Sequence, residues 1–170
     1  MRILMLSDVC APRVNGVATS IRTFRRSLAA LGHESILVAP DYPLPTAPDP
    51  TILRVPSRPV PGDAEDRLMH WRDVIALEPR LARLDFDVVH VHTPFVAHYA
   101  GVRLARRLGL PLIETYHTFF EEYAPLYFPW LPAGLGRWIA RRLTVSQCRQ
   151  VDALVVPSPQ MLGRLAEYGI

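Results

Sequence analysis

Short apolar runs and longer amphipathic stretches alternate along the chain, and this alternation predicts a sheet with helices on both faces. Residues 2–7, RILMLS, contain a continuous apolar run of the kind found in buried parallel strands. Residues 17–32 place apolar side chains three and four positions apart, as an amphipathic helix does, and end at a glycine. Strands separated by helices indicate right-handed crossovers, so we expect a Rossmann-like, doubly wound and mostly parallel α/β sheet.

The remaining elements follow from the same patterns. Further strands are predicted at 33–40, 51–56, 86–94, 110–118 and 151–158, and further helices at 66–78, 95–109, 135–150 and 159–169. The stretch 40–62 is rich in proline, which cannot donate to a ladder, so 51–56 is the one strand expected within it. Pro79 is expected to break or kink the helix that precedes it.

The composition is that of one globular domain. The chain has 170 residues, of which 49% are apolar and 21% are charged. Its net charge is only +3 and it lacks the dense basic stripe of a nucleic-acid binder, so no nucleic acid is expected as a partner. Cys10 and Cys148 lie far apart with no metal-ligand spacing, which disfavours a disulfide framework and a zinc site and favours the cytoplasm. The first residues turn polar too early for a signal peptide, and no apolar run is long enough to span a membrane.

Polar residues follow four of the predicted strands at the point where each strand ends. They are Ser7, Asp8, His92, Thr93, His117, Thr118 and Ser158. An open parallel sheet binds its ligands beyond the carboxyl ends of its strands, near the point where the strand order reverses. The sequence therefore predicts one polar rim that lines a binding crevice.

The loop before the first predicted helix is a candidate anion site. Its residues Asn15, Gly16 and Val17 lead into the helix N-terminus, where free N–H groups and the helix dipole favour an anion such as phosphate. Gly16 has no Cβ to keep a ligand away from the backbone. The alternative is an ordinary turn before a helix. The loop lacks the G-x-G-x-x-G pattern and no acidic residue ends the strand 33–40, so a nicotinamide oxidoreductase is disfavoured.

Two histidines stand at equivalent strand ends. His92 and His117 each follow an apolar strand, and each precedes a threonine. A neutral imidazole at such a position can hydrogen-bond a hydroxyl group or a developing charge. The alternative for each is a structural histidine that caps the next helix. His90 is expected to pack against a helix, and His98, within a predicted helix, is expected to be structural.

The segment 115–130 is dense in aromatic residues and proline, which suggests an apolar pocket or a surface that meets another apolar body. Within it, Glu121 and Glu122 are candidate acids or bases. Adjacent residues on one helical turn do not face each other, so they do not form a glycosidase-type carboxylate pair. The alternative for one of them is a solvated helix start.

The helix predicted at 135–150 combines a tryptophan with several arginines. Trp138, Arg137, Arg141 and Arg142 form the pattern of a basic amphipathic helix that lies on an anionic membrane. The alternative is a helix whose apolar face rests on the sheet while its arginines stay in water. Both arrangements remain open from the residues.

Four ordered motifs together resemble a known family. They are LSDVCAPRVNGVATSIRTFRRSLAALGHE, DVVHVHTPF, LPLIETYHTFFEEY, and VDALVVPS followed by LAEYGI. In this order they are similar to the N-terminal domain of the retaining glycosyltransferases of family 4, which have the GT-B fold. The resemblance covers nearly the whole chain, and within the family it is strongest to the bacterial branch that glycosylates diacylglycerol or related lipids.

The resemblance implies two Rossmann-like domains around a cleft, in which the N-terminal domain receives the acceptor and the C-terminal domain binds most of the nucleotide sugar. It implies that Asn15, Gly16 and Val17 meet the diphosphate of a UDP- or GDP-sugar and that His117 is the catalytic residue beside the transferred sugar. The residues implied on the acceptor side are His92, Thr93, Thr118, Glu121, Glu122 and Tyr123. The leaving phosphate would assist attack from the same face, and no metal or other cofactor is expected where the protein supplies the stabilising charge.

The sequence ends at LAEYGI, where members of the family continue into a linker and a second domain. Residues 1–170 are thus expected to form a single Rossmann-like domain, without the C-terminal nucleotide-sugar-binding domain, and to have little or no transferase activity alone. A truncated piece, a fragment of a longer gene product and one half of a split enzyme all remain open. The leading function is the acceptor half of a sugar transferase that acts on a lipid or sugar acceptor at the inner face of the cell membrane. A non-catalytic binding or regulatory module of the same fold is the alternative.

Overall fold

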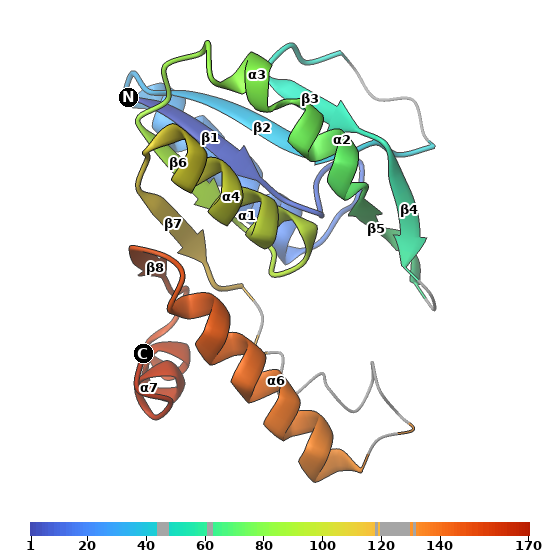
Figure 1. Cartoon of the computed structure of the whole chain (residues 1–170), viewed down its shortest axis with the longest axis vertical. Helices are drawn as coiled ribbons and strands as arrows, with labels where there is room; N and C mark the ends of the chain where they lie inside the picture. Colours follow the sequence, from blue (N-terminus) through green and yellow to red (C-terminus); the bar gives the residue numbers. More distant parts are fainter. Residues whose placement is uncertain (44–47, 61–62, 118, 120–129, 131) are drawn as a thin grey trace.

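A six-stranded sheet forms the body of the molecule (Figure 1). The computed structural model describes residues 1–43, 48–60, 63–117, 119, 130 and 132–170. The strands lie in the order β3-β2-β1-β6-β7-β8, and every neighbouring pair is parallel. Their bounds are β1 Arg2–Leu6, β2 Glu34–Pro40, β3 Ile52–Val55, β6 Val88–Val91, β7 Leu112–Thr115 and β8 Ala153–Val155. The strand order reverses between β1 and β6, which makes the carboxyl ends of these two strands the switch point of the sheet.

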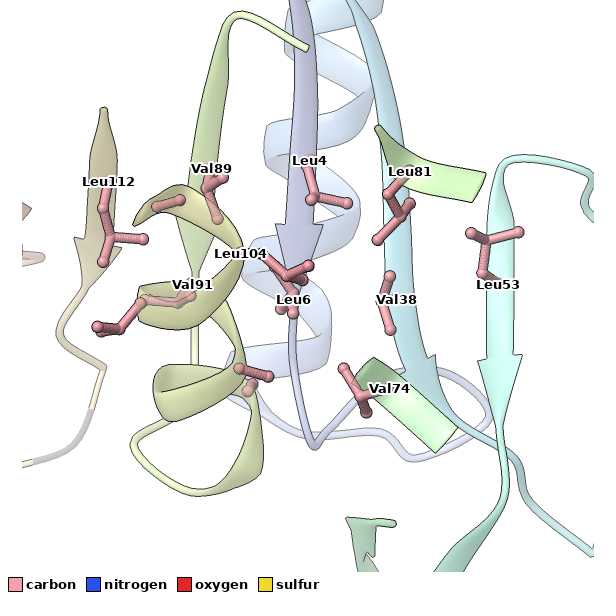
Figure 2. Close-up of a cluster of buried hydrophobic side chains, with 14 of the residues drawn as sticks. Leu4, Leu6, Val38, Leu53, Val74, Leu81, Val89, Val91, Leu104 and Leu112 are labelled. Atoms are coloured by element: carbon pink, nitrogen blue, oxygen red, sulfur yellow. The ribbon is translucent and has the colours of Figure 1, made fainter. Parts of the chain in front are cut away.

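Helices cover both faces of the sheet. Their bounds are α1 Gly16–Ala30, α2 Trp71–Ala76, α3 Glu78–Leu81, α4 Val96–Leu108, α6 Ala133–Cys148 and α7 Pro159–Ala166. Leu4 and Leu6 of β1 pack on the face covered by α2, α3 and α4, where Figure 2 shows them beside the other side chains of that core. Ile3 and Met5 pack on the opposite face against α1. Because both faces of β1 are buried from residue 3 onward, its sequence is apolar from Ile3 to Leu6. The predicted doubly wound α/β sheet is confirmed.

Helix α4 comes very close to the sheet at Gly101. A Cβ at this position would overlap Cγ1 of Val91 in β6, so only glycine allows the observed separation of helix and strand. The helix ends at Gly109, whose φ of 68° lies in the left-handed region that glycine adopts without strain. The close approach at Gly101 sets the distance between α4 and β6, the two elements that flank the loop with His92.

The proline-rich stretch contains a strand pair that the sequence did not predict. β4 (Ser57–Val60) and β5 (Asp63–Met69) form an antiparallel two-stranded ribbon separate from the main sheet. The expectation that 51–56 is the one strand of this stretch is therefore wrong. The helix predicted at 66–78 is wrong only in its start, because residues 66–69 belong to β5 and α2 begins at Trp71. Pro59 is tolerated because each strand of a two-stranded ribbon has an open edge, and the register shifts between Pro59 and Val60.

The helix break predicted at Pro79 is confirmed. α2 ends at Ala76, and α3 begins at Glu78 with Pro79 in its first turn, where the N–H that proline lacks has no helical partner. The Glu78 carboxylate lies 3.5 Å from Nε of Arg103 and 3.0 Å from Nε of Arg107. These contacts join the short helix α3 to α4.

The carboxyl-terminal elements have a small core of their own. Tyr116, Phe119, Cys148 and Leu165 are buried together there, and the Tyr116 hydroxyl lies 3.1 Å from Oγ1 of Thr144 in α6. Figure 1 shows α6 extending away from the main sheet, with α7 beside its carboxyl-terminal half. A large part of the α6 surface is therefore not covered by the sheet.

Candidate functional site

A pocket of about 110 Å³ opens at the carboxyl ends of the central strands, beside the switch point. Its lining includes the predicted residues Asn15, Val17, His92, Thr93 and His117. Asp66 of the unpredicted ribbon strand β5 also lines it. Ser158, the last predicted member of the polar rim, instead caps α7 by accepting a hydrogen bond from the N–H of Met161. Of the predicted rim, His92, Thr93 and His117 thus line one pocket, whereas Ser7 and Asp8 are buried and are not part of its lining.

The first loop presents the N-terminus of α1 to this pocket. Asn15 is the N-cap of α1, and its Oδ1 accepts a hydrogen bond from the N–H of Ala18 at 2.9 Å. A Cβ built on Gly16 would meet no atom of the described residues within 4 Å, so the fold itself does not require glycine there. Since alanine is the better helix former, a glycine at the first position of α1 suits the close approach of a ligand.

Two arginines hold the same loop in place. Arg54 of β3 donates a hydrogen bond to the carbonyl of Ala11 at 2.8 Å and another to the carbonyl of Pro40 at 2.9 Å. Arg13 pairs with Glu65 and, at 3.2 Å, with Asp66 of β5. The loop therefore has a defined shape although it contains no tight glycine turn. Sequence reasoning missed both arginines, because each of these contacts joins residues that are far apart in the sequence.

His92 and His117 meet at the edge of the pocket. Nδ1 of His92 lies 3.2 Å from Nε2 of His117, and the two rings stack with their centroids 5.5 Å apart. The contact arises because β6 and β7 run parallel with Val91 opposite Glu114, so that the two strands end side by side. The prediction that both histidines occupy one crevice is confirmed in its geometry, while their chemical roles stay predictions.

The other two buried histidines have structural partners, as expected. The ring of His90 packs edge-on against Phe24 of α1, and its Nε2 lies 2.7 Å from Oγ1 of Thr115. Nδ1 of His98 lies 3.0 Å from Oε2 of Glu114, and both side chains are buried between α4 and β7. Neither residue belongs to the candidate ligand contacts.

Burial keeps the site histidines neutral. It lowers the pKa of His117 from 6.5 to about 4, and it lowers the pKa of His92 well below that ordinary value, with His90 and His117 adding to the effect on His92. At neutral pH each ring therefore carries one proton and has one donor and one acceptor nitrogen. No group of three or more potential metal ligands comes together within the described part of the chain. The expectation that sugar transfer needs no metal ion stays a prediction.

Asp8, which the sequence predicted as a rim residue, is buried beside the pocket residue Thr93. Its carboxylate accepts hydrogen bonds from Oγ1 of Thr93 at 2.9 Å and from the N–H groups of Ala97 at 2.8 Å and Met69 at 3.4 Å. The N–H of Asp8 donates back to Oγ1 of Thr93 at 2.8 Å. Burial raises the pKa of Asp8 to about 6, and these hydrogen bonds oppose the rise. Asp8 thus links the end of β1 to β5 and to the start of α4. The hydroxyl group of Thr93 donates its hydrogen bond to Asp8.

Several predicted acceptor-side residues lie outside the described residues. They are Thr118, Glu121, Glu122 and Tyr123. Their predicted contact with an acceptor stays a prediction. The neighbouring Phe119 is described, and it is buried in the core shared with Cys148 and Leu165.

Helix α6 exposes large apolar side chains. Leu135, Trp138 and Leu143 are 45%, 57% and 51% exposed, whereas the residues that α6 buries include the small Ala140 and Thr144. The alternative in which the apolar face of this helix rests on the sheet is therefore wrong for Trp138. The bulkiest apolar side chains of α6 thus lie on its exposed surface.

The predicted arginines lie on the same exposed surface of α6. Arg137, Arg141 and Arg142 are all exposed, and the guanidinium of Arg142 lies 5.5 Å from the centre of the Trp138 ring. Arg141 lies 4.3 Å from the centre of the Tyr168 ring. Among the described residues, no helix combines the length and the apolar character needed to cross a bilayer.

The sequence matches the family model described as Glycosyltransferase Family 4 over residues 14–170. The chain belongs to glycosyltransferase family 4. This confirms the resemblance inferred from the four ordered motifs. The match includes the loop at Asn15 and Gly16, both site histidines and the whole of α6.

Two relatives are similar along the whole chain. Alpha-monoglucosyldiacylglycerol synthase of Streptococcus pneumoniae is 31% identical over 174 residues, which cover 100% of this chain and 38% of the relative. A GDP-mannose-dependent alpha-mannosyltransferase of Mycobacterium tuberculosis is 30% identical over 179 residues, which cover 100% of this chain and 45% of the relative. The chain thus spans less than half the length of these relatives.

A solved structure shares the fold. The complex of MnaA from S. aureus with UDP has a TM-score of 0.52 and 17% sequence identity, over 99% of this chain and 41% of that chain. At this identity the similarity concerns the fold alone. The predicted Rossmann-like half of a GT-B fold is confirmed by this likeness together with the parallel sheet.

Proposed function

We propose that this family 4 chain is the acceptor-side domain of a retaining glycosyltransferase that transfers a sugar from a nucleotide diphosphate to diacylglycerol or a membrane glycolipid. The observation that carries the proposal is the pocket that joins the N-terminus of α1 to the His92–His117 pair. A nucleotide sugar offers a diphosphate to the first feature and sugar hydroxyl groups to the second. The names of the two relatives, one GDP-mannose-dependent and one a glucosyldiacylglycerol synthase, support this assignment.

The donor diphosphate is proposed to bind at the N-terminus of α1. The Asn15 side chain caps the N–H of Ala18, and the first turn of α1 contains no acidic residue that would repel an anion. The N–H groups of Gly16 and Val17 and the helix dipole then favour the diphosphate and the negative charge that develops on it as the sugar leaves. UDP- and GDP-sugars share this diphosphate, so the loop accommodates either nucleotide.

In the proposed transfer, the bond between the sugar carbon and the phosphate oxygen breaks while the acceptor oxygen bonds to the same carbon from the same face. The acceptor proton passes to the leaving phosphate. His117 is proposed to hydrogen-bond an oxygen of the sugar or of the acceptor, and its position in the pocket lining supports this role. His92 and Thr93 are proposed to contact the acceptor.

A second domain is proposed to close this cleft and to hold most of the nucleotide. The pocket has a volume of about 110 Å³, whereas pockets that enclose small-molecule ligands measure about 300–1,000 Å³. The pocket therefore covers only part of a nucleotide sugar. For this reason we expect little or no transfer from the chain alone.

The exposed face of α6 is proposed to contact the anionic inner face of the cell membrane, where a lipid acceptor resides. Trp138 and Leu135 supply apolar side chains that insert into the headgroup region, and the flanking Arg141 and Arg142 supply attraction to anionic headgroups. The helix lies along the surface in this arrangement and does not cross the bilayer.

Transfer is tested by joining the chain to the C-terminal domain of a family 4 relative and supplying UDP-glucose or GDP-mannose with diacylglycerol vesicles. We expect a glycolipid product from the joined protein, and at least a hundredfold less product from the chain alone or from a His117→Ala variant. Donor binding without any product, across lipid and sugar acceptors, would instead identify a non-catalytic binding module.

Membrane contact is tested by flotation with vesicles that contain or lack anionic lipid. We expect the chain to float with anionic vesicles only, and the Arg141→Ala/Arg142→Ala variant to lose most of this binding. The matched control is Arg22→Ala/Arg26→Ala on the exposed surface of α1, which removes the same charge from another part of the molecule. Equal losses in the two double variants would show that net charge, and not α6, attracts the vesicles.

A further inference from the structure

The hydrogen bond between His92 and His117 has a direction, and the surroundings of His92 determine it. We infer that His92 is a positioning residue that donates from its Nδ1 to Nε2 of His117, and so holds His117 in the tautomer that carries its proton on Nδ1. The inference deepens the proposed function, because it rests on His117 facing the substrates and states which chemistry His117 can offer them.

The geometry permits the bond to run either way. The two nitrogens are 3.2 Å apart and the rings stack at an interplanar angle of 26°, so one nitrogen of each ring is committed to this contact. Both rings are neutral, since burial lowers the pKa of each, and each therefore has a single proton to place. If His92 donates, His117 accepts at Nε2 and its proton must sit on Nδ1. If His117 donates, the proton of His92 must sit on Nε2.

The second arrangement leaves a buried N–H without an acceptor. Nε2 of His92 is fully buried, the residue is 2% exposed, and this nitrogen has no hydrogen-bond partner among the described residues. The rings of Phe24 and His90 pack against the His92 ring, with centroids 5.8 Å and 4.1 Å away. A phenyl ring is at best a weak acceptor. Buried N–H groups without a partner are rarer in proteins than under-used acceptors, so the proton of His92 belongs on Nδ1.

The consequence concerns what His117 does at the pocket. With Nε2 occupied by His92, the Nδ1–H group is the one that His117 has left for a ligand, and it is a donor. His117 then donates a hydrogen bond to an oxygen of the sugar or of the acceptor. A neutral imidazole in this tautomer has no free lone pair with which to take a proton from an acceptor hydroxyl, so His117 is not the general base.

The tautomer is measured directly on this chain by long-range ¹⁵N–¹H correlation of ¹⁵N-labelled histidine at pH 7.5. Two variants of equal side-chain length separate the hydrogen bond from packing: His92→Gln keeps an N–H donor at this position, and His92→Met removes it. We expect protonated Nδ1 at His117 in the wild type and in His92→Gln, and a shift toward protonated Nε2 in His92→Met. The melting temperatures of both variants show how much packing each one loses.

Two results would overturn the inference. A proton on Nε2 of His117 in the wild type would reverse the direction of the bond, and this spectrum needs no variant to fold. An identical His117 spectrum in the Gln and Met variants would show that His92 does not set the tautomer.

The effect of His92 on sugar transfer is measured separately, in the protein joined to a C-terminal domain. We expect kcat to be about tenfold lower for His92→Met than for His92→Gln, with little change in KM for the donor. In His92→Met, His117 no longer donates its hydrogen bond to the sugar or acceptor oxygen, and that bond acts on the transfer step and not on donor binding. Equal kcat values for two variants with different His117 tautomers would refute the donor role of His117. If the joined wild-type protein transfers no sugar, the proposed function fails, whereas the tautomer measurement still decides the direction of the bond.

Discussion

Protonation of a buried histidine should destabilise this fold in mild acid, and His90 provides the test. Its side chain is 6% exposed, and its pKa falls from 6.5 to about 4 because of burial and, second, because of the neighbouring His117. A folded-state pKa below the unfolded value contributes stability that is present above about pH 6.5 and is lost as the pH falls toward about 4. The free energy of unfolding should therefore decrease between these two pH values.

The magnitude follows from the same two pKa values. At pH 5 the ring is protonated in the unfolded chain, with a pKa of 6.5, and still neutral in the folded chain, with a pKa of about 4. One pKa unit corresponds to about 1.36 kcal/mol, so the step from pH 6.5 to pH 5 lowers the free energy of unfolding by about 2 kcal/mol through His90. That is a large share of the free energy of unfolding of a typical domain, which is roughly 5–15 kcal/mol.

The assay is urea unfolding of the wild type and of His90→Gln at pH 7.5 and at pH 5. Glutamine does not titrate, and it keeps a polar group near the Thr115 hydroxyl that His90 contacts. Packing losses that are equal at the two pH values cancel when the two free energies of one protein are subtracted. We expect this difference to be about 2 kcal/mol smaller in His90→Gln than in the wild type.

The matched control is Thr115→Val, which removes the hydroxyl group that His90 contacts but leaves the titrating ring in place. It should leave the difference between pH 7.5 and pH 5 close to the wild-type value. If His90→Gln gives the same difference as this control, the reasoning from burial to acid sensitivity is wrong.

Three further substitutions test the site and its support. Asp8→Asn should steepen the acid loss between pH 7.5 and pH 5 by about 1 kcal/mol in the same urea assay, because the raised pKa of Asp8, about 6, lets the folded chain bind a proton before the unfolded chain does. Gly101→Ala should lower the free energy of unfolding by about 2 kcal/mol at either pH, since its Cβ would overlap Val91; an unchanged midpoint would contradict the close contact of α4 and β6. Gly16→Ala should leave the stability unchanged or raise it by up to about 1 kcal/mol, yet lower kcat/KM for the donor about tenfold in the joined protein. Its control is Gly163→Ala, another helical glycine with open space at Cβ, and equal activities of the two variants would remove the α1 N-terminus from donor binding.

Much of the sheet was predictable because strands and helices follow local periodicity. A strand buried on both faces needs an unbroken apolar run, as in β1, and an amphipathic helix needs apolar residues on one side, as in α1. Right-handed crossovers then leave few ways to order parallel strands. The positions of His92 and His117 at strand ends followed from the same rules, and so did their common edge.

The unpredicted elements are those whose reasons lie outside their own segment. The β4–β5 ribbon reads as a proline-rich loop followed by a helix, and it forms because β5 finds an antiparallel partner in β4 and an anchor in Asp8. The exposed position of Trp138 could not be read from the pattern of α6, since that pattern does not say which side of a helix meets the protein. For both the ribbon and α6, the local sequence allows two arrangements, and contacts with residues far along the chain determine which one forms.

The parallel sheet with its helices and the place of His92 and His117 at strand ends were thus predictable from the sequence, because side-chain periodicity and helix crossovers depend on neighbours along the chain. The bonds made at the rim were determined by the folded structure. Asp8 and Thr93 are 85 residues apart, and His92 and His117 are 25 apart, yet each pair is within hydrogen-bond distance. Such contacts depend on the register of β1 with β6 and of β6 with β7, and the burial that keeps the histidines neutral exists only once those strands are packed.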